Sequence, residues 1–260
     1  MDNLPKFEAL LSKKLDLPFY SVTNQTYPRK QDYHILTALA GLGASLHKFA
    51  FDLRILQSPP IGELAEPFGS QQVDSSAMPF KRNPIRAEKI NSLARLLAQF
   101  PRTVWDNAAH SLLERTLDDS ANRRTILPEA FLVADELLRI AVSIVMGLIV
   151  DESAMTCNLA IYGPFAATER VLMALGKAGA DRQEIHARLR QHSLTAWDAI
   201  RTGRPNPLAE SITCDPEIRH YLPENQLRAH MDASHYVGDA PQRAAAFADT
   251  INAKLGNTGL

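Results

Sequence analysis

The sequence predicts an all-α protein, in which a long-helix bundle is followed by a smaller helical C-terminal domain. Only 12 of the 260 residues are glycine. No segment shows the sustained alternation of apolar and polar residues that is typical of a half-buried strand. Instead, apolar residues recur at helical spacing, most clearly from Asp32 to Leu56, where one face stays apolar over about seven turns. A helix of that length favours a bundle or an oligomer core.

Residues 1–150 are predicted to form most of the bundle. Ser58–Gly62, which contains two prolines, stops the first long helix, and further prolines keep residues 62–84 irregular. Three more helices are expected at 85–99, 103–117 and 126–150, with Pro128 in the first turn of the last one. The apolar run 140–150 is too short for a bilayer span of about 20 residues, so it predicts a buried helix.

Residues 151–260 are predicted to form a separate, smaller domain, because long helices give way to short ones near Val150. Two short helical pieces are expected within 151–180, on either side of Tyr162–Pro164. One helix at 182–202 and a loop at 203–207 follow. Prolines and a glycine divide 213–260 into short helices.

Composition and charge argue against several kinds of partner. The formal net charge is −1, so no overall field would draw the protein to nucleic acid or to an anionic membrane. The N-terminus lacks the apolar core of a signal peptide. Cys157 and Cys214 match no metal or redox spacing, and free thiols fit a reducing cytoplasm. We therefore expect a cytoplasmic protein with no metal site, no nucleic-acid partner and no membrane association.

The polar loop 70–84 has an unusual composition. It contains two adjacent serines, Ser75 and Ser76, a Met-Pro step and an Asn-Pro corner. Four cations lie within nine residues, namely Lys81, Arg82, Arg86 and Lys89. A helix that starts near Pro84 would add free backbone N–H donors for an anion. A solvated basic loop is the plain alternative, but adjacent serines and proline-fixed corners favour an anion-binding site.

The string Ser75–Pro84 reads Ser-Ser-Ala-Met-Pro-Phe-Lys-Arg-Asn-Pro. It is similar to the signature loop of the fumarase/aspartase superfamily, whose members remove a proton beside a carboxylate, break a C–N or C–O bond and expel fumarate. The resemblance implies that Ser75 is the general base, activated by cations and N–H donors that stabilise its alkoxide. It assigns Lys81 and Asn83 to the substrate carboxylate, where charge develops in the transition state.

Two further segments resemble one branch of this superfamily, the adenylosuccinate lyases. Glu114–Arg124 is similar to the family sequence that follows the signature helix, which implies that its arginines and serine bind the phosphate and purine side of the substrate. A mixed-charge helix end with internal ion pairs is the structural alternative. Thr23–Lys30 resembles the family's Gly-Gln-Thr-Tyr-x-Arg-Lys, and Gln25 matches a substrate-contacting glutamine. A helix cap at Thr26 or Asp32 is the alternative there.

The resemblance extends from Asp16 to about Ile251 and implies specific site residues. The catalytic residue is Ser75, and the substrate-binding residues are Gln25, Ser76, Met78, Lys81, Asn83, Lys89, Arg115, Ser120 and Arg124. The fold implied is part of the superfamily's central bundle domain at 1–150, with the signature loop at 70–84, followed by a C-terminal helical domain at 151–260. The family's first domain and its general-acid histidine have no counterpart here, so the isolated chain is expected to be inactive.

The activity implied is cleavage of adenylosuccinate to AMP and fumarate, and of SAICAR to AICAR and fumarate, by β-elimination in purine biosynthesis. The resemblance implies no cofactor, and self-association to a homotetramer through helices 32–56 and 126–150. Two alternatives stay open. One is another fumarate-releasing lyase, such as argininosuccinate lyase, which is not expected to carry the string Arg115–Arg124. The other is a non-catalytic helical oligomerisation scaffold, which the missing domain and Asp74, in place of the superfamily's glycine, favour.

Overall fold

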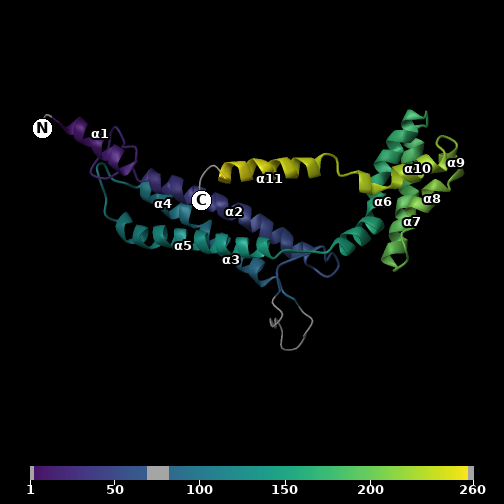
Figure 1. The fold of residues 1–260 in the computed structure, drawn as a ribbon, viewed down its shortest axis with the longest axis horizontal. Helices are drawn as coiled ribbons and strands as arrows, with labels where there is room; N and C mark the ends of the chain where they lie inside the picture. Colours follow the sequence, from purple (N-terminus) through teal and green to yellow (C-terminus); the bar gives the residue numbers. More distant parts are fainter. Residues whose placement is uncertain (1–2, 69–81, 257–260) are drawn as a thin grey trace. The chain divides into compact units, whose positions relative to one another are not determined.

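The computed structural model describes residues 3–68 and 82–256 of the chain. Contacts divide the chain into two compact units, Met1–Val150 and Asp151–Leu260 (Figure 1). The predicted all-α class is confirmed, because the regular secondary structure of the described residues is helical apart from two strands of two residues each, which the sequence did not predict. None of the described helices is long and apolar enough to cross a membrane.

The first unit is built from long helices that lie along one another (Figure 1). Its elements are α1 (Leu4–Leu15), α2 (Lys30–Leu56), β1 (Leu64–Ala65), α3 (Ile85–Leu97), α4 (Phe100–Ala109), α5 (Asp119–Met146) and β2 (Ile149–Val150). Helix α2 packs against α3, α4 and α5. The core between them is aliphatic and includes the fully buried Leu36, Leu53, Ile90, Leu97, Val104, Leu137 and Ile144.

Helices α2 and α5 run in the same direction, and this order positions the candidate site. Near their starts, Arg123 of α5 pairs with Asp32 of α2. Beyond their ends, β1 pairs with β2 in antiparallel register. Helix α3 runs in the opposite direction, since Glu88 near its start pairs with Arg54 near the end of α2, whereas Leu97 at its end lies against Gly43, earlier in α2.

Two predicted helices of this unit have different bounds. The helix expected at 103–117 begins earlier, at Phe100, and ends at Ala109. The residues that follow are irregular, and Leu113 has a positive φ of 36°, which a helix cannot accommodate. The helix expected at 126–150 begins at Asp119, so Pro128 lies inside α5 rather than in its first turn. Pro128 has no N–H to donate to the carbonyl of Arg124, and the helix continues past this single missing bond.

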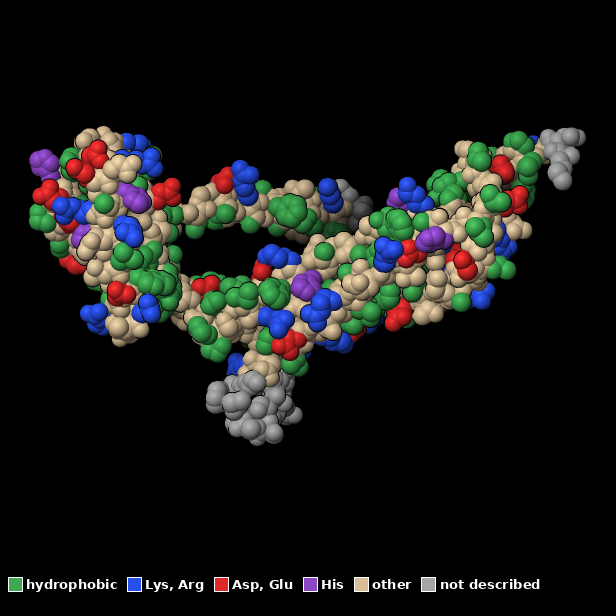
Figure 2. Space-filling model, turned by 180° about the vertical axis from the view of Figure 1, so that it is seen from behind, with side chains coloured by type: hydrophobic (Ala, Val, Ile, Leu, Met, Phe, Trp, Pro, Cys, Tyr) green, Lys and Arg blue, Asp and Glu red, His purple; other side chains and the backbone are tan. Residues whose placement is uncertain are grey.

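The apolar run 140–150 is only partly buried, which corrects the prediction of a buried helix. Ala141 and Ile144 face the core, whereas Val142, Val145 and Met146 are exposed. Figure 2 shows hydrophobic side chains exposed among charged ones on the surface of the chain. The far face of α5 has no partner among the described residues, so its apolar side chains meet solvent.

The second unit consists of helices that are mostly shorter. These are α6 (Glu152–Lys177), α7 (Arg182–Arg201), α8 (Leu208–Thr213), α9 (Pro216–Arg219), α10 (Glu224–Met231), the 3₁₀ helix η1 (Ala233–His235) and α11 (Ala240–Gly256). Its core lies between α6, α7, α8 and α10 and includes Val171, Leu175, Leu189, Leu208, Ile212 and Leu227. Aspartates at the N-caps of α6, α7 and α9, namely Asp151, Asp181 and Asp215, accept backbone N–H bonds.

The prediction of two short pieces within 151–180 is wrong, because α6 is one helix of 26 residues with Pro164 inside it. Pro164 removes one backbone donor, but the neighbouring carbonyl of Ile161 accepts a bond from Asn206 Nδ2 at 2.7 Å. Gly163 lets α6 approach η1 closely, since a Cβ there would lie 2.8 Å from the Cβ of Ala233. These tertiary contacts support a helix that local sequence alone would break.

Candidate active site

The predicted site residues fall into two described groups and one undescribed stretch. Ser75, Ser76, Met78 and Lys81 lie outside the described residues. Asn83 and Lys89 lie near the end of α2, whereas Gln25, Arg115, Ser120 and Arg124 lie near its start. The two groups have different surroundings.

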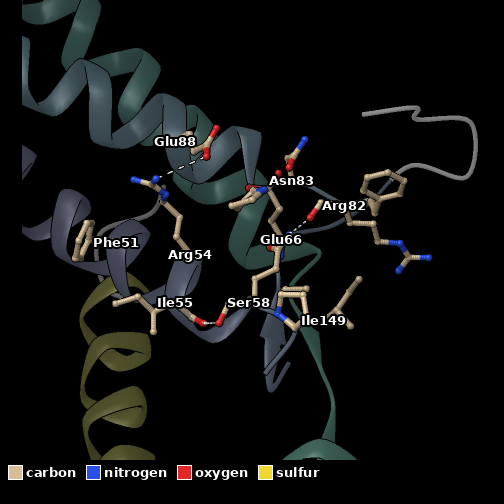
Figure 3. Close-up of a pocket in the computed structure, with 14 residues that line it drawn as sticks. Phe51, Arg54, Ile55, Ser58, Glu66, Arg82, Asn83, Glu88 and Ile149 are labelled. Atoms are coloured by element: carbon tan, nitrogen blue, oxygen red, sulfur yellow. Dashed lines mark hydrogen bonds and ion pairs between the residues drawn. The ribbon is translucent and has the colours of Figure 1, made fainter. Parts of the chain in front are cut away.

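Asn83 lines a cavity of about 710 Å³ where α2 ends and α3 begins (Figure 3). The cavity has an apolar side, formed by Phe51, Ile55 and Ile149, and a polar side with Arg54 and Glu88. Its volume lies within the range of about 300–1,000 Å³ that small-molecule sites occupy. The cavity is therefore large enough for a metabolite-sized ligand beside Asn83.

The polar side of the cavity is organised by Arg54. Its Nη1 donates to Asn91 Oδ1 at 3.0 Å, and its Nη2 lies 3.6 Å from Glu88 Oε1. Figure 3 shows Arg54 directed toward Glu88, while Arg82 points away from both. Arg82 instead covers the ring of Phe68, 5.1 Å from its centroid. Arg54 belongs to no motif, so the sequence did not indicate it, and its position in the same cavity as Asn83 follows only from the pairing of α2 with α3.

The start of α3 corrects the expectation of free N–H donors for an external anion. The N–H groups of Arg86 and Ala87 donate to the two carboxylate oxygens of the buried Glu66, at 3.1 Å and 2.9 Å. The N–H of Ile85 donates to the backbone oxygen of Asn83, and that of Glu88 to the backbone oxygen of Pro84. An internal carboxylate therefore already occupies this helix terminus.

Two basic side chains near the start of α3, Arg86 and Lys89, face α5 rather than Asn83. Lys89 Nζ lies 2.5 Å from Glu136 Oε1, and Arg86 Nη1 donates to Ser143 Oγ at 3.1 Å. The side chain of Lys89 does not belong to the lining of the cavity at Asn83. The structure thus brings Arg86 and Lys89 together, but on the α5 side of α3.

The second group joins two segments that are 90 residues apart in the sequence. Arg115 Nη1 donates to Gln25 Oε1 at 3.4 Å, and Asn24 Nδ2 donates to the backbone oxygen of Leu113 at 3.5 Å. Ser120 is half-buried in the first turn of α5, and Arg124 follows one turn later on the same face. The structure therefore collects four of the predicted residues at one end of the unit.

A buried ionic cluster lies beneath these four residues. Arg123 Nε lies 2.7 Å from Asp32 Oδ2, and Arg29 Nε lies 2.5 Å from Asp119 Oδ2. The hydroxyl of Tyr27 donates to Asp32 at 2.7 Å and also accepts a bond from Arg123. Asp32 and Asp119 are 3% and 2% exposed. We call Tyr27, Arg29, Asp32, Asp119 and Arg123 the buried ionic cluster.

Burial and charge shift two groups of this cluster. Burial, the hydrogen bond to Asp32 and its negative charge raise the pKa of Tyr27, so its hydroxyl keeps its proton. Burial opposes the charge of Arg123, but the hydrogen bond to Asp32 and the charges of its neighbours together outweigh burial and raise the pKa of Arg123. The cluster thus ties residues 23–30 to the starts of α2 and α5. Sequence spacing did not indicate it, since its members are spread over nearly a hundred residues.

The two groups cannot meet within one chain. Helix α2 is continuous over 27 residues, which at about 1.5 Å per residue gives a length of about 40 Å. The cluster is joined to its first turn through Asp32. Asn83 lies beyond its last turn, where Gln57 Nε2 donates to the backbone oxygen of Arg82 at 3.2 Å. Gln25 and Asn83 therefore lie at opposite ends of a rigid rod.

Cation-binding groups are not evident in the part of the chain that the structure describes. Within residues 3–68 and 82–256, no three or more His, Cys, Asp or Glu side chains are arranged to hold a metal ion.

Comparisons with known proteins place the chain in a family. Residues 164–247 match the family model for the adenylosuccinate lyase C-terminus, and residues 3–97 match the model described as lyase. The chain is 41% identical over 249 residues to an adenylosuccinate lyase of Schistosoma mansoni, an alignment covering 94% of this chain and 51% of that protein. It is 40% identical over 230 residues to an adenylosuccinate lyase of Schizosaccharomyces pombe, covering 88% of this chain and 47% of that one.

Its fold is also similar to a solved structure, the fumarate lyase from Mesorhizobium sp. BNC1. The TM-score is 0.74 at 26% identity, and the match covers 92% of this chain and 51% of that protein. The chain thus spans about half the length of the curated relatives it matches. Because the family models, the relatives and the fold agree, the chain belongs to the adenylosuccinate lyase family of the fumarase/aspartase superfamily, and it corresponds to a C-terminal portion of its members.

Proposed function

We propose that this chain provides part of the active site of an adenylosuccinate lyase. The reaction is the cleavage of adenylosuccinate to AMP and fumarate, and of SAICAR to AICAR and fumarate. The observation that carries the proposal is the hydrogen bond between Arg115 and Gln25. It joins two segments that were assigned to the same substrate on separate grounds.

The proposed chemistry is a β-elimination. Ser75 takes the proton from the carbon beside a substrate carboxylate, and Lys81 and Asn83 stabilise the negative charge that develops on that carboxylate. The electron pair then forms the double bond of fumarate as the C–N bond breaks, and the leaving nitrogen takes a proton from a general acid. Ser76, Met78 and Lys89 are proposed as further substrate-binding residues, and Lys89 would have to leave Glu136 on the α5 side of α3 to take this role. Proton transfer and carboxylate binding suffice, so we propose no cofactor.

At the other end, Arg115, Ser120 and Arg124 are proposed to bind the phosphate and purine side. Each arginine–phosphate contact is a charge-assisted hydrogen bond, worth about 1.5–3 kcal/mol. Arg115→Gln and Arg124→Gln should therefore raise KM for adenylosuccinate by about 10–100-fold. Arg139→Gln is the control, because Arg139 lies on the same helix as Arg124 and its ion pair with Asp135 is exposed. Fumarate release, followed by absorbance, measures all three.

The same assay separates the runner-up lyase. Argininosuccinate carries no phosphate, so a site built around Arg115 and Arg124 should release fumarate from adenylosuccinate and not from argininosuccinate. Turnover of argininosuccinate alone would overturn the purine assignment. If a chain of the relatives' full length bound fumarate or AMP but released no fumarate from either substrate, the result would support the non-catalytic scaffold.

We further propose that a complete site combines copies of the chain, in a homotetramer. The two groups of site residues lie at opposite ends of α2, about 40 Å apart. In addition, α5 exposes an apolar stripe that includes Phe131, Leu138, Val142 and Val145, at spacings that place them on one helix face. Light scattering should show a tetramer, and Val142→Asp together with Val145→Asp should shift it toward smaller species. A monomer for the unmodified chain would contradict this.

We propose that residues 1–260 alone release no fumarate. The cavity at Asn83 has no histidine in its described lining, and the chain spans about half the length of its relatives. Loss of a general acid lowers rates by about 10²–10⁴-fold. The assay compares residues 1–260 with a lyase-length chain, meaning these residues together with the additional length that the relatives have. Equal turnover by the two would refute the proposal.

Action on a small purine metabolite also fits a cytoplasmic location.

A further inference from the structure

Helix α3 begins at Ile85, two residues after the signature residue Asn83, and has no side-chain cap of its own. Its N-cap is Pro84, which makes no side-chain hydrogen bond. Proline has no polar side chain, so the cap residue offers no side-chain acceptor to the N–H groups of the first helical turn. These donors are satisfied all the same, as described above, and the acceptor for the two in the middle is Glu66.

Glu66 is attached to the rest of the unit at two further points. It follows directly after β1, whose pairing with β2 holds the backbone there. Its own N–H donates to Gln57 Oε1 at 3.0 Å. Gln57, at the C-cap of α2, uses its Nε2 to donate to the backbone oxygen of Arg82 at 3.2 Å. The side chain of Glu66 is thereby enclosed, and the residue is 2% exposed.

Asn83 is therefore held on both sides by contacts from outside its own segment. On the N-terminal side, Gln57 holds the carbonyl of Arg82. On the C-terminal side, Glu66 holds the first turn of α3 through Arg86 and Ala87. Figure 3 shows Asn83 and Glu66 close together at the start of α3, beside the cavity. Neither Gln57 nor Glu66 belongs to the string Ser75–Pro84.

We infer that Glu66, supported by Gln57, is a positioning residue for the proposed lyase reaction. By capping α3 it sets the location of Asn83, and so the hold of Asn83 on the substrate carboxylate. This inference rests on the proposed function of Asn83. Displacement of a site residue by about 1 Å can lower a rate about 100-fold. Because Asn83 acts on charge that develops in the transition state, the effect should fall mainly on kcat.

The first test uses Glu66→Gln in the lyase-length chain. The amide keeps the size of the side chain and one acceptor oxygen, but it turns an NH₂ toward a backbone donor, so one of the two bonds is lost. We expect kcat to fall about 10–100-fold with KM changed less than about threefold. Gln57→Met, which removes the bond to the Arg82 carbonyl at similar size, should lower kcat in the same direction.

Asp181→Ala is the matched control. Asp181 caps α7 in the second unit by accepting two N–H bonds with its side chain, from Gln183 and Glu184. Asp181→Ala should lower the melting temperature, as the change at Glu66 does, since both changes leave backbone N–H groups at a helix N-terminus without their acceptor. It should leave kcat within about twofold of wild type, because no proposed site residue depends on it. A purely structural role for Glu66 predicts equal kinetics for the two variants.

Hydrogen exchange on residues 1–260 separates this inference from the proposed function. In Glu66→Gln the amides of Arg86 and Ala87 should exchange faster, while those of Gln183 and Glu184 keep the wild-type rate. Unchanged exchange at Arg86 and Ala87 would overturn the inference, whatever the enzyme does. If exchange quickens but kcat stays at the wild-type value, Glu66 is only a cap and the positioning role is refuted. If wild-type lyase-length chain releases no fumarate at all, the proposed function fails, and with it the catalytic part of the inference.

Discussion

The buried ionic cluster makes a quantitative prediction about Arg123. Arg123→Met keeps a long apolar stem and removes the guanidinium that lies 2.7 Å from Asp32. Asp32 would be left buried with only the hydroxyl of Tyr27, while Asp119 keeps Arg29. Removing one partner of a buried ion pair costs about 3–5 kcal/mol. Because Tyr27 and Arg29 remain, we expect the lower end, about 3 kcal/mol, and a drop in melting temperature of about 6–12 °C.

The assay is urea unfolding of the first unit, followed by the fluorescence of Trp105 in a Trp197→Phe background. Trp105 lies in the first unit and Trp197 in the second, so this background reports on the first unit alone. The control is Arg139→Met, since Arg139 pairs with Asp135 on the same helix but both are exposed. That exposed pair is worth at most about 0.5 kcal/mol. Equal losses in Arg123→Met and Arg139→Met would refute the view that burial makes the cluster important.

Two further predictions concern the second unit. Gly163→Ala should destabilise it, because the new Cβ would lie 2.8 Å from the Cβ of Ala233. Gly176→Ala in the same helix would place its Cβ where nothing lies within 4 Å, so it should stabilise the unit by about 0.5–1 kcal/mol. Thermal unfolding of the two variants compares them directly. Burial alone would raise the pKa of Asp215, but hydrogen bonds from His192, Arg188 and the first turn of α9 lower it. A carboxyl whose pKa is lower in the folded than in the unfolded protein contributes stability above the unfolded pKa of about 3.9, and this stability is lost as the pH falls through the folded pKa. Between about pH 5 and pH 3, the wild type should therefore lose more free energy of unfolding than Asp215→Asn, as measured by urea titrations.

Helical periodicity predicted most of the fold because the first unit buries a simple aliphatic stripe. Helix α2 was expected from Asp32 to Leu56 and spans Lys30–Leu56. The errors arose where tertiary contacts override local signals. Pro164 suggested a break, but the bond from Asn206 and the close approach at Gly163 keep α6 whole. The helix expected to reach Leu117 stops at Ala109, because the next residues form the loop that brings Leu113 to Asn24.

The candidate site was predictable only in part, for a related reason. Motifs identified Asn83, Gln25 and the string that holds Arg115, since each motif is local in sequence. The residues that hold these motifs in place are distant in sequence and carry no pattern of their own. Glu66 belongs to no motif. Its role becomes apparent only in the structure, where the N-cap residue Pro84 makes no side-chain hydrogen bond and Glu66 accepts from the first turn of α3 instead. The motifs that contain Gln25 and Arg115 lie at the start of α2, and the motif that contains Asn83 lies at its end. This placement follows only from the direction of the helices.

The central claim is that one active site combines the proposed base Ser75 of one chain with Arg115 of another. The most direct measurement mixes two lyase-length variants, Ser75→Ala and Arg115→Ala, after separate purification, dissociation and joint reassembly. Each variant alone should release fumarate from adenylosuccinate very slowly, whereas the mixture should recover activity, because some sites then receive both intact ends. A mixture that stays as slow as its components, although light scattering shows that mixed oligomers have formed, would contradict the claim.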